Sequence, residues 1–205
     1  MKKAYKILGI SAILTLFVSI VLELYIFIST LPNYAINLNE GASNVVCFIE
    51  CIIATVVLLI HIFGGVKCLV KLFNNECTFN YFAETFVCFA FLDAIVNLAF
   101  TVCFISIKES KISDPFVIAS LVIFSLTLLT CFVARYIKRE SKILNTICII
   151  LFLGTAILGF FEVNNQLIGK EIIPTIEFIL PIIECLSITQ AIAISLFSFK
   201  NSNNL

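Results

Sequence analysis

The sequence predicts an all-α membrane protein, a polytopic bundle of six transmembrane helices with both termini cytoplasmic. Three observations predict this fold class. The 205 residues are 61% hydrophobic and only 13% charged, whereas a soluble domain usually carries about 25% charged residues. Six apolar stretches each reach the roughly 20 residues that a helix needs to cross the hydrocarbon layer. Lys and Arg are concentrated in alternate connections between these stretches.

The connections between the apolar stretches are short, so we expect one integral membrane domain over residues 1–205 and no soluble domain. The predicted spans cover about residues 7–30, 44–66, 82–107, 116–136, 143–163 and 172–199. Helices are expected throughout, because backbone polar groups in lipid must pair within their own segment. No stretch shows the sustained polar–apolar alternation of a membrane β-barrel.

The basic residues predict the orientation, because Lys and Arg are enriched in cytoplasmic connections. One side carries Lys2, Lys3, Lys6, Lys67, Lys71, Arg135, Lys138, Arg139, Lys142 and Lys200, and the other carries only Lys108, Lys111 and Lys170. We therefore expect a multi-pass protein of the cell membrane with cytoplasmic termini. Two cysteines, Cys68 and Cys77, are expected in the cytoplasmic second loop and the other seven within spans, so no disulfide framework is indicated.

The first span has a basic start and an apolar run, which also fits a secretory signal peptide. The run is longer than the apolar core of a signal, and no clear small-x-small cleavage site follows it. Within the span, Ser11, Thr15 and Ser19 recur at steps of four, a spacing that favours close packing of membrane helices. Glu23 lies in its outer part.

The second span places Glu50 and His61 eleven residues apart, which is three helical turns and therefore one face. Such a face suits a proton path, since histidine titrates near neutral pH. The alternative is a histidine that is hydrogen-bonded within the bundle. Cys47 and Cys51 share a turn with Glu50, but ligands within one turn seldom converge on a metal ion, so no metal site is predicted.

The third span carries Asp93 near its middle, followed by Asn97 and Thr101 at steps of four, which gives one polar face. The fifth span contains Gly154 and Gly159, which we expect to permit close approach of a neighbouring helix.

The sixth span is the most informative. Glu177 and Glu184 are seven residues apart and share a face. Pro181 lies between them, and its missing N–H frees the carbonyl of Glu177. Two carboxyl groups and a free carbonyl on one face suit a cation or a proton, as at the broken helices of transporters. The alternative is an ordinary proline kink.

The buried acids are the main functional signal, because a charged side chain at the bilayer centre costs about 2.5–3.5 kcal/mol. No Lys or Arg lies at matching depth. We expect the acids to be gathered inward, in an acidic cavity that opens outward. The predicted substrate- or cation-binding residues are Glu50, Asp93, Glu177 and Glu184.

Motifs for other functions are missing. The sequence has no P-loop, no His-Glu-x-x-His and no Gly-x-Ser-x-Gly, and its single histidine excludes sites that need two. We expect no enzyme and no cofactor. Nucleic acid is not an expected partner, because no basic stripe is present. The expected partners are the lipid bilayer, a cation or small cationic solute, and other membrane subunits.

Two functions remain open from the sequence. One is a small-solute or cation transport component. The other is a non-catalytic scaffold or accessory subunit of another membrane complex, which the short loops and missing motifs favour. The general plan, six helices in about 200 residues with a site opening outward, is similar to the substrate-capture subunits of energy-coupling-factor transporters. Those subunits often carry Ala-x-x-x-Ala in the first helix, where this chain has Ser11, Thr15 and Ser19.

Overall fold

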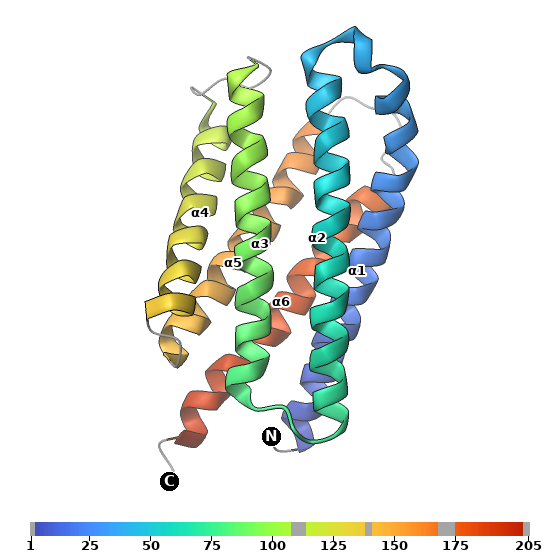
Figure 1. Ribbon diagram of the computed structural model, residues 1–205. Helices are drawn as coiled ribbons and strands as arrows, with labels where there is room; N and C mark the ends of the chain where they lie inside the picture. The colour runs from blue at the N-terminus through green and yellow to red at the C-terminus, as the bar shows by residue number, and fades with distance from the viewer. Residues whose placement is uncertain (1–2, 108–113, 138–140, 168–174, 203–205) are drawn as a thin grey trace.

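The computed structural model describes residues 3–107, 114–137, 141–167 and 175–202 (Figure 1), with no side chain described at residues 40, 160–167, 175–178 and 197–202. Over these ranges the chain is all-helical and has six helices long and apolar enough to cross a membrane. They are α1 Lys3–Ile36, α2 Ala42–Phe73, α3 Phe79–Ser106, α4 Pro115–Phe132, α5 Lys142–Leu167 and α6 Thr175–Ser202. The prediction of an all-α chain with six apolar helices is confirmed. Residues 172–174, where the sixth span was predicted to begin, lie outside the described ranges.

The six helices form a closed ring in chain order. Each helix packs against the next one, α6 returns to pack against α1, and α3 also contacts α5 across the ring. Two short turns complete the path: a 3-10 turn at Leu38–Glu40 between α1 and α2, and a π-helical turn at Val133–Ile137 after α4. Because the ring is closed, each helix presents one face to a shared interior.

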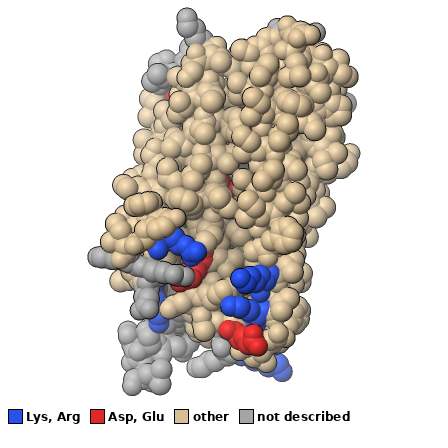
Figure 2. Space-filling model, in the orientation of Figure 1, with Lys and Arg blue, Asp and Glu red and all other residues tan. Residues whose placement is uncertain are grey.

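The outer face of the bundle is apolar. Large hydrophobic side chains such as Val21, Phe63 and Leu129 are more than half exposed. Figure 2 shows an almost continuous uncharged surface on the face in view, with Lys and Arg gathered toward one end. Exposed apolar area of this extent is consistent with a lipid bilayer as the surrounding solvent.

The end where α1 begins and α6 ends (Figure 1) is called the basic end here. Three cations make defined contacts at this end. Lys6 donates to the carbonyl of Phe73 at 3.1 Å and to the Asn75 side chain at 2.9 Å. Lys71 lies 3.7 Å from the Tyr81 ring centroid.

The third of these cations, Arg135, lies 3.8 Å from the Glu84 carboxylate and so joins the end of α4 to the start of α3. The ends of α1, α2, α3 and α4 are thus held together by polar contacts at the basic end.

The turn between α2 and α3 corrects one prediction. Cys68 was expected in a loop, but α2 continues to Phe73 and holds Cys68 fully buried within it. The turn is shorter than expected because Asn75 adopts a left-handed conformation, with φ of 62°, which asparagine tolerates better than most residues. The side-chain oxygen of Thr78 then accepts the backbone N–H of Tyr81 and begins α3.

The apolar core fills the half of the bundle nearer the basic end. Its largest fully buried side chains include Ile13 on α1, Leu72 on α2, Phe86 on α3 and Phe152 on α5. In α1 and α3 the core residues come before Glu23 and Asp93, and in α6 most come after Glu184. The core therefore separates these acidic side chains from the basic end.

Candidate functional site

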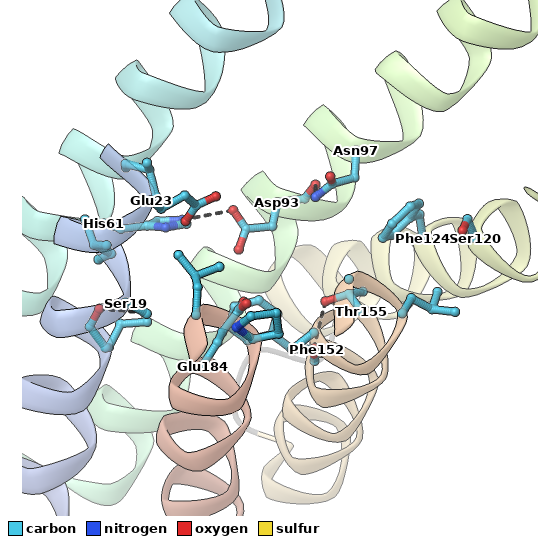
Figure 3. A pocket seen from close by; sticks show the side chains of 18 residues that line it. Ser19, Glu23, His61, Asp93, Asn97, Ser120, Phe124, Phe152, Thr155 and Glu184 are labelled. Atoms are coloured by element: carbon cyan, nitrogen blue, oxygen red, sulfur yellow. Dashed lines mark hydrogen bonds and ion pairs between the residues drawn. The ribbon is translucent and has the colours of Figure 1, made fainter. Parts of the chain in front are cut away.

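All six helices contribute to one central cavity, which we call the acidic chamber. Its volume is about 200 Å³. Glu23 of α1, Asp93 of α3 and Glu184 of α6 line it together with His61 of α2. Figure 3 shows these four side chains directed toward a common space between their helices. The structure thus brings together Asp93 and Glu184, two of the residues selected from the sequence.

The remaining lining of the chamber is uncharged. α4 contributes Ser120 and Phe124, and α5 contributes Phe152 and Thr155. Within the described residues no Lys or Arg lines the chamber. An interior with three carboxyl groups and no fixed cation has a strong preference for positive charge.

The carboxyl groups are not satisfied by the bundle itself. Within the part of the chain that the structure describes, no hydrogen bond reaches the carboxylates of Glu23, Asp93 or Glu184, and each residue is only partly buried. Their oxygens therefore face the chamber. Hydroxyl groups behave differently: Thr15 donates to the carbonyl of Ser11 at 2.8 Å, within its own helix.

His61 lies at the wall of the chamber, with 3% of its side chain exposed. The backbone of Phe89 hydrogen-bonds its imidazole, and the Phe89 ring packs against it at 4.5 Å between centroids. The Nε2 atom has no hydrogen-bond partner among the described residues. Its nearest acidic group is the Asp93 carboxylate, with Oδ1 at 3.6 Å. The interpretation of His61 as a histidine bonded within the bundle thus agrees with the contact to Phe89, whereas the proton path along the face of Glu50 and His61 stays a prediction.

Two glycines that follow His61 on α2 leave room for aromatic rings to pack close to the helix backbone. A Cβ atom on Gly64 would lie 2.8 Å from the Phe89 ring, and one on Gly65 would lie 2.5 Å from the Phe17 ring. These two glycines of α2 let the aromatic rings approach its backbone. Among the side chains that the structure describes, nothing lies within 4 Å of a Cβ built on Gly159, so the expected close approach is not found there, and Gly154 makes only an ordinary contact at 3.7 Å.

Glu50 does not line the acidic chamber. It lies between two further cavities, which share lining residues with the chamber. The linking cavity, about 60 Å³, is lined by Glu23, Glu50, Asp93 and Asn97. The upper passage, about 260 Å³, is lined by Glu50, Asn97, Thr101 and Asp114.

Asn97 is common to all three cavities. Asp114 caps the start of α4, at the end of the bundle opposite the basic end, where its carboxylate accepts the N–H of Phe116 at 2.9 Å. The three cavities therefore form a polar series from that end toward the chamber.

The polar face of α3 is used along this series. Asn97 donates to the carbonyl of Asp93 at 2.9 Å, and Thr101 donates to that of Asn97 at 2.7 Å. These bonds stay within α3, so the helix satisfies its own polar donors while the side chains line the cavities.

The remaining sequence-selected residue, Glu177, belongs to α6, but its side chain lies outside the described residues. Pro181 is inside α6, as expected, and lines the chamber beside Glu184. Sequence reasoning had noted Glu23 and His61 without selecting them as site residues. The signal that would have selected them is their location within apolar spans, which applies to every buried acid and histidine of the chain.

No three His, Cys, Asp or Glu side chains among the described residues lie close enough together to hold one metal ion. The acids surround a volume instead of converging on a point. Comparisons of the chain with protein-family models, with curated proteins and with solved structures found no match.

Proposed function

We propose that the protein is a small-solute or cation transport component of the cell membrane, of the substrate-capture type, and that the acidic chamber holds its cationic solute. One observation carries the proposal: carboxyl side chains from α1, α3 and α6 meet the histidine of α2 in one cavity that contains no fixed positive charge among its described lining. Burial of such groups in a membrane bundle is costly, and it is typical of ion and substrate pathways.

The size of the chamber favours a small organic ammonium ion as the solute. An apolar cavity of about 150 Å³ in a protein core holds a benzene molecule, and the chamber measures about 200 Å³. Asp93 and Glu184 would supply the charge that the ammonium group needs. Phe124 and Phe152 line the same space and offer aromatic rings, which attract cations over their faces.

The route and the orientation belong to the same proposal. We place the basic end in the cytoplasm because Lys and Arg favour that side, which makes both termini cytoplasmic. The upper passage and linking cavity then lead inward from the outside, and the apolar core closes the chamber toward the cytoplasm. Glu50 would attract the cation on its way in. Glu177 stays in the proposed set of binding residues, on the same face of α6 as Glu184.

A ligand-binding test on the purified full-length protein separates transport from scaffolding. The unfolding midpoint would be measured with methylammonium, choline, sodium and potassium. At one hundred times its dissociation constant, a bound ligand adds about 2.7 kcal/mol of stability. We expect such a shift with an organic ammonium ion, its loss in Glu184→Gln, and its retention in Glu76→Gln, a matched change at an exposed acid in the α2–α3 turn.

Uptake of the same ion into proteoliposomes then tests transport itself. If no cation shifts the unfolding midpoint of the unsubstituted protein, and a fixed protein partner co-purifies with it, the transport proposal fails. The scaffold or accessory subunit would then be the better description.

A further inference from the structure

The buried Nε2 atom of His61 raises the question of where the proton between His61 and Asp93 lies. The imidazole is hydrogen-bonded to the backbone of Phe89, and Nε2 has no hydrogen-bond partner among the described residues, so the bond to Phe89 uses Nδ1. A neutral ring with its proton on Nδ1 carries a lone pair on Nε2. That lone pair faces the Asp93 carboxylate, with Oδ1 3.6 Å away. Two acceptors would oppose each other unless one proton lies between them.

We infer that the Asp93–His61 pair holds this proton and releases it when a cation enters the acidic chamber, so that the proposed cation binding is a proton exchange. The inference rests on the proposed function of the chamber. In the protonated state either Asp93 is a neutral carboxylic acid that donates toward Nε2, or His61 is an imidazolium ion beside a carboxylate. Both forms carry the same total charge.

The charges around the Asp93–His61 pair favour exchange of a proton for the cation over binding of the cation without proton release. Glu23 approaches from α1 and Glu184 from α6, and the residues that α4 and α5 contribute to the chamber are uncharged. Glu50 shares the linking cavity with Asp93. A monovalent cation adds one positive charge and the departing proton removes one. The total charge of the chamber then stays constant, which avoids the large energy of a charge change at low dielectric.

The step balances without any further reactant. The cation enters the chamber, the proton leaves the Asp93–His61 pair for water, and Asp93 remains a carboxylate beside the cation with His61 neutral. No covalent bond between heavy atoms forms or breaks. Both ions would move through the upper passage, whose lining includes Asp114 at the end opposite the basic end.

Titration calorimetry with methylammonium in two buffers of different ionisation enthalpy measures the protons released per cation bound. We expect about one proton per cation near neutral pH, and an apparent dissociation constant that rises about tenfold for each unit of pH lowered, since reciprocal linkage applies to proton and cation. Asp93→Asn is expected to bind more weakly through Glu23 and Glu184 and to release no proton. Glu76→Gln is expected to match the unsubstituted protein.

The outcomes distinguish this inference from the function on which it rests. Cation binding without proton release and without a pH-dependent affinity overturns the proton exchange and leaves the binding site standing. Undiminished proton release in Asp93→Asn also overturns it, because the proton would then come from another group. Absence of cation binding to the unsubstituted protein overturns the proposed function as well.

A second measurement uses only the unsubstituted protein and methylammonium, so it does not depend on a variant that folds well. The pH dependence of the affinity is determined on the unsubstituted protein, and infrared difference spectra across the same pH range report the carbonyl band of a protonated carboxylic acid or the bands of an imidazolium ion. One of these signals must disappear as the pH rises. If neither changes while cation affinity does, the pair is not the source of the proton.

Discussion

Gly64 offers the sharpest test of how the wall of the chamber is built. It lies on α2, close behind His61, and an added methyl group would meet the Phe89 ring at 2.8 Å and 3.1 Å. An ordinary contact begins at 3.4 Å, so the ring would have to withdraw by about 0.6 Å. Phe89 is only 2% exposed, and the imidazole of His61 lies 4.5 Å away between ring centroids. The ring has little space in which to move.

The magnitude follows from two opposing effects of Gly64→Ala. Overpacking of a filled core typically costs about 1–3 kcal/mol. Replacing glycine by alanine within a helix returns about 0.8–1.0 kcal/mol. Gly154→Ala on α5 is the matched control, because it has the same helical gain but its added methyl group meets only Ile123 at 3.7 Å. The helical contribution cancels between the variants, so Gly64→Ala should be less stable than Gly154→Ala by about 1–3 kcal/mol.

Reversible unfolding of both variants in mixed micelles, with increasing denaturing detergent, measures this difference directly. Gly64→Ala should also weaken cation binding, because the displaced Phe89 ring presses on the imidazole that faces Asp93. Equal stability of Gly64→Ala and Gly154→Ala would refute the reasoning. It would mean that the Phe89 ring moves freely and that His61 is not fixed by the packing described above.

Two further predictions concern the ring of helices and its orientation. Ser187 of α6 is fully buried and donates to the carbonyl of Ala12 on α1 at 2.8 Å. Ser187→Ala should therefore lose about 0.6–1.7 kcal/mol of stability in the same unfolding assay. The control Thr189→Ala should lose little, because the exposed hydroxyl of Thr189 bonds only within α6. An impermeant maleimide applied to intact cells should label Asn39→Cys but not Glu76→Cys, with the unsubstituted chain as background, because these exposed positions lie at opposite ends of the bundle. Labelling of Glu76→Cys alone would reverse the proposed orientation.

The sequence predicted the helices well because long apolar runs leave the backbone little choice in lipid. It placed Asp93 and Glu184 at depth along their spans, since the rise per residue of a helix is fixed. Rotation of each helix about its axis is set by packing between helices, and one sequence does not reveal it. The meeting of Glu23, Asp93 and Glu184 in one chamber, with Glu50 displaced into a neighbouring cavity, is a result of that packing.

The glycines show the same limit. Gly154 and Gly159 were expected at close approaches because small residues favour them, yet the close approaches occur at Gly64 and Gly65. All four are glycines within apolar runs, and nothing local distinguishes them. The difference lies in the partner, since bulky rings from α1 and α3 face α2 at those two positions. The size of the opposing side chain, which is a property of the fold, decides where a glycine is needed.

Hydroxyl and amide donors in this bundle differ from the carboxylates of the chamber, and the difference supports the functional interpretation. Thr15, Asn97 and Thr101 donate to carbonyls of their own helices, so these donors need no partner from another helix. A carboxylate cannot be satisfied in this way, because it only accepts hydrogen bonds and the backbone N–H groups of its helix are already paired. Three acids that face one chamber therefore need protons or a cation from outside the fold. A scaffold would gain nothing from that requirement, whereas a protein that captures cations depends on it.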